Sequence, residues 1–147
     1  MTDAVDPFSI RNRTFLVVGG TRGIGLAISL QFARAGARVL VNYVRSEDAA
    51  QSLQEIANAE NLQIELIRAD VSMDKGREHL VAEVLNRAEA LHGIVFAAAT
   101  GVHRTMDTLS ARHFDFVFSL NVRAYLLLVQ SLLPRLASGS CIIALSS

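Results

Sequence analysis

The sequence predicts an α/β fold: a Rossmann-type, doubly wound parallel sheet with five strands. Short apolar runs alternate with helical patterns along the whole chain. The runs are apolar throughout, as expected for strands that are covered on both faces. A cluster of glycines follows the first run. Since crossovers between parallel strands are right-handed, this order favours a doubly wound sheet, which binds ligands at the carboxyl ends of its strands.

Two strand–helix units are predicted in the first half of the chain. The apolar run Thr14–Val18 ends at glycines and is expected to be a buried strand. The following helix, Ile24–Ala35, carries apolar residues among small ones and ends at Gly36, a typical residue after a helix C-terminus. A β-rich segment, Arg38–Tyr43, forms the second strand. The segment Glu47–Glu60 has apolar residues along one helical face and forms the second helix.

The second half continues the alternation. Branched apolar residues indicate strands, and apolar residues at helical spacing indicate helices. Ser110 is a residue that can cap the last helix. In order, the elements are the strand Gln63–Ala69, the helix Met73–Ala90, the strand Gly93–Ala98, a long helix from Ser110 to about Ala137, and the strand Cys141–Leu145.

The composition of the chain limits the classes of protein to which it can belong. The 147 residues are about one domain's worth, so residues 1–147 are expected to form one dinucleotide-binding domain. The chain is 51% hydrophobic, which excludes a disordered chain, and its 14 basic residues balance 14 acidic ones, which argues against a nucleic-acid partner. A single cysteine, Cys141, favours the cytoplasm. No apolar run reaches the roughly 18 residues of a membrane span, and the N-terminus lacks a secretory signal's basic region.

The loop after the first predicted strand carries the most informative motif. Glycines stand at positions 19, 23 and 25. Gly19 permits a tight turn, Gly23 lets the backbone approach a pyrophosphate, and Gly25 lets the helix pack closely on the strand. The helix start offers free N–H groups and a positive dipole end to phosphates. The loop therefore predicts a dinucleotide site; the alternative is a structural turn that binds no ligand.

The end of the second predicted strand indicates which dinucleotide binds. An NAD site usually has an acidic residue there to hold the ribose 2′-hydroxyl. This chain has Tyr43, Arg45 and Ser46 in that region, and no acid. Arg22, inside the glycine loop, can face the same pocket, and two guanidinium groups suit a 2′-phosphate. NADP(H) is thus favoured over NAD(H); alternatively, Arg45 is a solvated loop residue and the specificity is loose.

At these motifs the sequence resembles the short-chain dehydrogenase/reductase family, from about residue 14 onward. The spacing G-x-x-x-G-x-G is that family's form of the dinucleotide fingerprint. Asp70-Val71 matches the family's adenine-pocket pair; alternatively, Asp70 caps a helix, and the two roles are compatible. The family usually shows Asn-Asn-Ala-Gly after the fourth strand. This chain departs from it with Phe96-Ala97-Ala98-Ala99, so the two asparagine side chains are missing.

The resemblance also implies the active-site edge. Asn121 matches an asparagine that helps to organise a proton-relay water, and Ser147 matches the serine that hydrogen-bonds the substrate oxygen, although a polar strand end would look the same. These two are the candidate catalytic residues. The candidate cofactor-binding residues are Gly19, Thr21, Arg22, Gly23, Ile24, Gly25, Tyr43, Arg45, Ser46, Asp70, Val71, Ala97 and Ala98.

The family's acid/base tyrosine and its lysine partner have no counterpart in this chain. Tyr43 and Tyr125 stand in the wrong elements, and Lys75 is the sole lysine. We therefore expect a fold that is incomplete relative to the family and inactive alone. A second polypeptide could complete it, and a homo-oligomer through the long helix is the other expected partner. The four histidines show no metal-ligand spacing, so no metal site is expected.

The expected function is an NADP(H)-dependent oxidoreductase that moves a hydride to or from a carbonyl or enoyl substrate. The nearest subgroups by resemblance are enoyl-acyl-carrier-protein reductases and ketoacyl reductases, which implies a small-molecule substrate such as an acyl thioester in fatty acid or polyketide metabolism. Two alternatives stay open. One is a non-catalytic dinucleotide-binding or assembly module, favoured by the missing asparagines, tyrosine and lysine. The other is an interaction subunit that has lost its cofactor.

Overall fold

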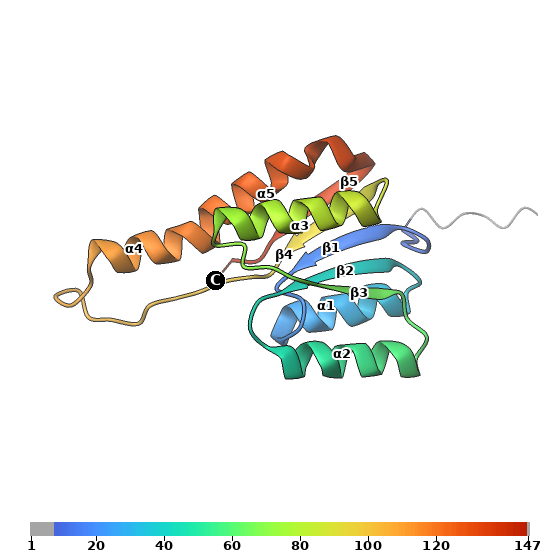
Figure 1. Cartoon of the computed structure of the whole chain (residues 1–147), viewed down its shortest axis with the longest axis horizontal. Helices are drawn as coiled ribbons and strands as arrows, with labels where there is room; N and C mark the ends of the chain where they lie inside the picture. The colour runs from blue at the N-terminus through green and yellow to red at the C-terminus, as the bar shows by residue number, and fades with distance from the viewer. Residues whose placement is uncertain (1–7, 147) are drawn as a thin grey trace, which may run out of the picture.

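The computed structural model describes residues 8–146, which form a five-stranded parallel sheet in the order β3-β2-β1-β4-β5 (Figure 1). This order confirms the doubly wound α/β fold expected from the sequence. The elements are β1 (Thr14–Val18), α1 (Gly23–Arg34), β2 (Arg38–Tyr43), α2 (Glu47–Ala59), β3 (Ile64–Arg68), α3 (Asp74–Arg87), β4 (Leu91–Phe96), α4 (Ala111–Phe118), α5 (Tyr125–Leu132) and β5 (Leu136–Ala144).

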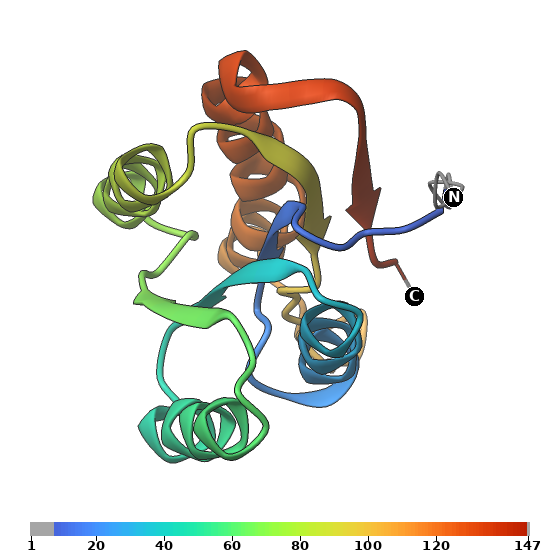
Figure 2. The same cartoon turned by 90° about the vertical axis from the view of Figure 1, so that its right-hand side faces the viewer.

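Helices cover the sheet in two layers. Figure 2, viewed along the strands, shows α1 and α2 on one face and α3 with the α4–α5 helix on the other. Side chains of a strand point alternately to the two faces, and β1 divides accordingly. Phe15 and Val17 pack with α1 and α2, whereas Leu16 and Val18 pack with α3 and α5. Both faces of the sheet are therefore buried, which explains why the central strands are apolar throughout.

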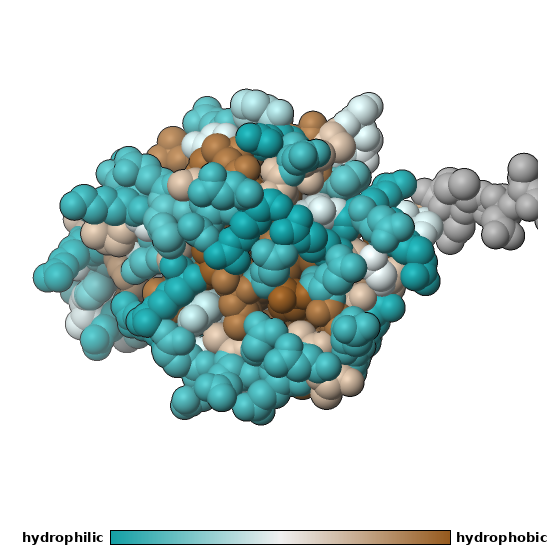
Figure 3. Space-filling view, turned by 45° about the vertical axis from the view of Figure 1, so that its right-hand side comes forward, coloured by the Kyte–Doolittle hydropathy of each residue, from teal (hydrophilic) through white to brown (hydrophobic). Residues whose placement is uncertain are grey.

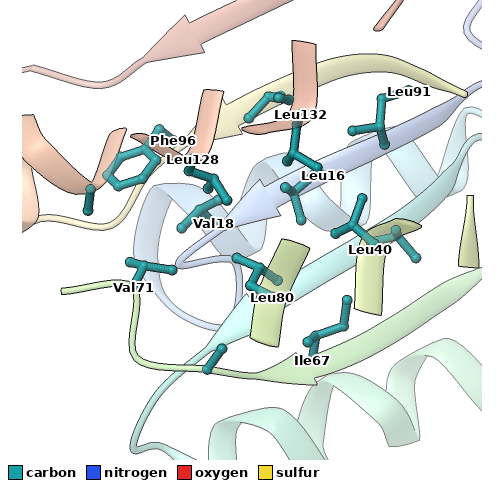
Figure 4. Close-up of a cluster of buried hydrophobic side chains, with 14 of the residues drawn as sticks. Leu16, Val18, Leu40, Ile67, Val71, Leu80, Leu91, Phe96, Leu128 and Leu132 are labelled. Atoms are coloured by element: carbon teal, nitrogen blue, oxygen red, sulfur yellow. The ribbon is translucent and has the colours of Figure 1, made fainter. Parts of the chain in front are cut away.

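The larger of the two cores lies beneath α3 and α5 (Figure 4). Leu80 of α3 and Leu128 and Leu132 of α5 are fully buried against Leu16 and Leu40 of the sheet.

The last helix differs from its prediction in two ways. A π-helical stretch, Ser119–Ala124, separates α4 from α5, and no sequence pattern predicted it. The helix also ends at Leu132, before the expected Ala137, and a short 3₁₀ turn over Leu133–Arg135 follows. Pro134 contributes to this end, because proline supplies no N–H group for the helical hydrogen bonds, although Leu133 before it keeps helical backbone angles.

Three other boundaries are corrected. Helix α3 is shorter than predicted and ends at Arg87, since Ala88 is extended. Strand β4 begins and ends two residues earlier than predicted. Strand β5 begins at Leu136 rather than Cys141, because Leu136 pairs with Leu91 before an irregularity in the ladder. The first half of β5 contains serines and a glycine, so no strand pattern predicted it.

Strand β5 is the edge of the sheet and pairs with β4 alone within the described residues. Ile142 is 36% exposed, Ile143 is 42% exposed and Leu145 is 38% exposed. An unpaired, apolar strand edge favours association with further polypeptide. Within the described residues, this apolar edge is left uncovered.

The helical stretch Ala111–Arg135 is long and apolar enough to cross a membrane by length and composition, with a mean hydropathy of 1.6 in its most apolar window. A core helix of a soluble fold passes the same test. Ala124, Leu128 and Leu132 of this stretch are buried in the core against the sheet, while only 17% of the most apolar window is buried. In Figure 3, apolar side chains form one patch in the middle of the face shown and another near its top, among polar side chains.

Replacing Leu128 by alanine should lower the free energy of unfolding by about 2–5 kcal/mol, because it leaves a cavity in the core under α5. The matched control is Leu126→Ala on the same helix, where the leucine is 52% exposed and the expected change is within about 0.5 kcal/mol. Urea denaturation of both variants measures the difference. Equal losses would show that α5 does not pack as described.

Candidate functional site

A cavity of about 300 Å³ lies where β1, β2, β3 and β4 end. Loops from all four strands meet here, because the carboxyl ends of parallel strands lie at one edge of the sheet. The cavity gathers most of the predicted cofactor-binding residues. They are Gly19, Thr21, Arg22, Tyr43, Arg45, Ser46, Asp70, Val71, Ala97 and Ala98.

The remaining predicted residues of the glycine loop, Gly23, Ile24 and Gly25, line an adjoining cavity of about 460 Å³. Arg22, Ala97 and Ala99 line both cavities, so the two lie side by side, and together they are called the groove. Leu145 and Ser146, which follow β5, line its far end. Ser147 lies outside the described residues. Every described residue predicted to bind the cofactor thus faces this groove.

Close backbone contacts explain two of the glycines. Gly19 has a φ of +78°, and a Cβ atom there would lie 2.8 Å from the Ala98 nitrogen. A Cβ atom on Gly25 would lie 2.2 Å from the Gly19 carbonyl oxygen. Gly25 therefore lets α1 pack against the turn itself rather than against the strand, which refines the role predicted for it. Gly23 has a φ of +52° and open space before it, as an approaching ligand requires.

Asn42, at the end of β2, joins the loops after three strands. Its carbonyl oxygen accepts hydrogen bonds from the N–H groups of Gly19 and Gly20, each at 3.0 Å. Its side-chain amide donates to the carbonyls of Ala69 at 3.0 Å and Ile67 at 3.2 Å. The side chain is fully buried, and its Oδ1 atom has no donor among the described residues. Sequence analysis missed this residue, although a lone polar residue in an apolar strand was its signal.

Hydrogen bonds within the loop after β3, and one from α3, hold this loop in place. Asp70 accepts hydrogen bonds at Oδ1 from the Ser72 N–H at 3.0 Å and the Ser72 hydroxyl at 2.6 Å. It caps this turn and not α3, whose N-cap residue is Met73. The buried Arg77 donates to the Val71 carbonyl at 2.8 Å and pairs with Asp74. These bonds fix Val71, which is buried, and the Asp70 carboxyl beside the groove.

The arginine-bearing end of the groove is basic. Arg22 and Arg45 are exposed, and neither forms an ion pair with a carboxylate in residues 8–146. Both guanidinium groups are therefore available to an anion. Tyr43 lies beside them; burial raises the pKa of its hydroxyl, and the hydrogen bond to Glu47 raises it further.

Asn121 sits in the π-helical stretch and does not line the groove. Its side chain forms two hydrogen bonds with the backbone of Thr100, each at 2.9 Å: Oδ1 accepts from the N–H group, and Nδ2 donates to the carbonyl. Thr100 itself lines the groove. Asn121 therefore holds the loop after β4 in place.

Sequence analysis also missed two apolar residues of the groove, Phe116 and Leu120. They lie one helical turn apart on the α4 side, a spacing that is equally typical of hydrophobic core residues.

In residues 8–146, no three potential metal ligands come together. A separate cavity of about 500 Å³ lies between α3 and α5 and includes Arg77, Val81 and Leu127. None of the predicted residues lines it.

A groove at the strand ends, with a glycine turn leading into α1, defines a dinucleotide-binding fold. Residues 13–147 match the short chain dehydrogenase family, and the chain belongs to that family.

The similar proteins are reductases and dehydrogenases. The chain is 32% identical over 137 residues to 1-cyclohexenylcarbonyl-CoA reductase of Streptomyces collinus, covering 93% of this chain and 49% of that protein. It is 31% identical to a hydroxynaphthalene reductase of Aspergillus fumigatus, covering 94% of this chain and 50% of that protein. A short chain dehydrogenase from Burkholderia cenocepacia, solved with NADP, superposes with a TM-score of 0.86 at 28% identity, covering 92% and 56%. The chain thus spans about half the length of these relatives.

Replacing Gly25 by alanine should lower the free energy of unfolding by about 1–3 kcal/mol, since the added methyl group meets the Gly19 carbonyl oxygen and the turn has to shift. Ala27→Ser, on the exposed side of the same helix turn, is the control and should change it little. Thermal and urea denaturation measure both. A fully stable Gly25→Ala variant would mean that α1 does not approach the turn this closely.

Proposed function

We propose that this chain is the nucleotide-binding part of an NADP(H)-dependent oxidoreductase, which transfers a hydride to or from a carbonyl or enoyl carbon of a small molecule. The observation that supports it most strongly is the single groove that all the described candidate cofactor residues share. Two relatives named as reductases and a structural neighbour solved with NADP support the same reaction class.

The proposed binding mode follows the groove. The glycine loop and the first turn of α1 hold the pyrophosphate through backbone N–H groups and the helix dipole. Arg22, Arg45 and Ser46 hold the 2′-phosphate, because guanidinium groups form strong charge-assisted hydrogen bonds with phosphate oxygens. Asp70 and Val71 lie where the adenine would bind. The backbone of Ala97 and Ala98 approaches the ribose on the nicotinamide side.

The bound nicotinamide would supply the hydride chemistry, and the chain's own residues orient it. Asn121 keeps Thr100 and the loop after β4 at the groove, and Ser147 is proposed to contact the substrate oxygen. Neither tyrosine lies at the far end of the groove: Tyr43 is the last residue of β2, and Tyr125 packs on Phe96 with its ring centre 5.6 Å away. The proton donor is therefore proposed to come from polypeptide beyond these residues, and the chain alone to be inactive.

The free edge of β5 supports a partner. We propose that further polypeptide, from a second chain or a longer one, pairs with this edge and covers Ile142 and Ile143. A homo-oligomer through α5 is the other proposed association, since Leu126 and Leu133 are exposed there. The chain is proposed to act in the cytoplasm as one domain over residues 1–147, with neither a membrane nor a nucleic acid as its partner.

A non-catalytic dinucleotide-binding module is the second candidate. The segment Phe96-Ala97-Ala98-Ala99 favours it, because it lacks the two asparagine side chains usual in the family. Such a module would bind NADPH in any complex without oxidising it. Turnover of NADPH with an acyl thioester or a ketone by the completed complex would exclude it.

NADPH should bind the purified protein more tightly than NADH, because the 2′-phosphate adds charge-assisted contacts to Arg22 and Arg45. Replacing Arg45 by alanine should weaken NADPH binding about tenfold or more and leave NADH binding within about twofold. Nucleotide fluorescence titrations measure all four values.

The matched control is Arg13→Ala, which removes an arginine at the opposite ends of the strands and should change neither affinity. Equal weakening of both nucleotides by Arg45→Ala would contradict the assignment of the 2′-phosphate site. Absence of NADPH binding by the unaltered protein would contradict the proposed function.

A further inference from the structure

One carboxylate lies next to the basic end of the groove. Glu47 is the first residue of α2 and comes two positions after Arg45. The residues between Tyr43 and Ser46 line the groove, and Glu47 follows directly. A carboxylate close to this turn bears on which nucleotide binds there, because NAD sites use an acidic side chain to accept a hydrogen bond from the ribose 2′-hydroxyl.

Both oxygens of this carboxylate are occupied. Arg68 pairs with Oε1 through its Nη1 atom, and the Tyr43 hydroxyl donates to Oε2 at 3.0 Å. The Arg68 Nε atom also donates to the Val44 carbonyl at 3.2 Å, which anchors the guanidinium under the turn. Tyr43 and Arg68 are direct neighbours in the register of β2 and β3, so the sheet itself sets this arrangement.

The charge that the turn presents depends on Arg68. A 2′-phosphate monoester carries a charge of about −1.5 to −2 at neutral pH. An uncompensated carboxylate beside it would repel it, whereas the same carboxylate would favour an uncharged ribose hydroxyl. With Arg68 in place, the Glu47 charge is compensated and its oxygens already accept hydrogen bonds. Arg45 is then the charged group of this turn that has no ion-pair partner among the described residues, and Arg22 lines the same cavity.

We propose that Arg68 is a specificity-determining, positioning residue: by holding and neutralising Glu47, it biases the groove toward NADP(H) and against NAD(H). This inference rests on the proposed function. It gives Arg68 a role through Glu47, without any contact of its own with the nucleotide.

The test is the ratio of the NADH dissociation constant to the NADPH dissociation constant. In Arg68→Ala this ratio should fall about threefold to tenfold, the effect of one charge acting over several ångströms at a protein surface. NADPH should bind more weakly and NADH more tightly. A merely structural defect would weaken both. Since Arg68 is 63% exposed, the variant is expected to fold, which circular dichroism checks.

Three further variants make the test specific. Arg68→Lys keeps the charge and should retain most of the ratio. The double variant Arg68→Ala with Glu47→Gln should recover it, since no carboxylate is left to compensate. Arg34→Ala is the matched control, because Arg34 and Glu60 form a comparable exposed pair that joins α1 to α2, and it should leave the ratio unchanged.

The outcomes separate the two proposals. If the unaltered protein prefers NADPH but Arg68→Ala keeps the same ratio, the inference is wrong and the proposed function stands. If the double variant stays as weak for NADPH as Arg68→Ala, then Arg68 contacts the phosphate directly, and masking of Glu47 is again wrong. If the unaltered protein binds neither nucleotide, the proposed function itself fails.

Discussion

The backbone and side chain of Asn42 bind together the strand ends on which the site depends. Its carbonyl oxygen accepts from both Gly19 and Gly20, and its amide donates to the carbonyls of Ile67 and Ala69. The loops after β1, β2 and β3 are thereby held in one arrangement. Asn42 is fully buried, and a buried polar group that loses its partner costs about 1–3 kcal/mol. The three loops are therefore expected to move together or not at all.

Close packing at two glycines extends this arrangement into the helices. Gly25 brings α1 against the Gly19 carbonyl, and a Cβ atom on Gly76 would lie 1.9 Å from the Asp70 carbonyl oxygen, so α3 approaches the loop after β3 just as closely. Ser29 adds to the first contact, because its buried hydroxyl donates to the carbonyls of Gly20 at 3.2 Å and Gly25 at 2.9 Å. The groove is thus formed by backbone that has little freedom, as tight binding of a nucleotide needs.

Much of this could be predicted from sequence. Apolar runs that alternate with helical patterns predicted the doubly wound parallel sheet, and the glycines after the first run predicted the position of the groove. Both signals lie within a few neighbouring residues. The capping of α4 by Ser110 was also predictable, and the structure shows its hydroxyl accepting from the His113 N–H group. Asp70 and Val71 were found through resemblance, since a two-residue motif after a strand has no periodicity of its own.

What could not be predicted depends on contacts between distant segments. The π-helical stretch around Asn121 accompanies bonds to Thr100, 21 residues earlier in the chain. The pairing of Leu136 with Leu91 starts β5 in a segment with no strand pattern. The compensation of Glu47 by Arg68 requires the register of β2 against β3. Local sequence patterns carry none of this information, so the compensation of Glu47 became visible only in the folded chain.

The central claim is that one groove, organised around Asn42, receives the nucleotide. The most direct measurement is an NMR titration of the ¹⁵N-labelled protein with NADPH. The account predicts that the largest amide shifts occur in residues 19–25, 43–46, 70–72 and 97–100, and that amides lining the cavity between α3 and α5 stay unshifted. Shifts confined to that second cavity, around Val81 and Leu127, would contradict it.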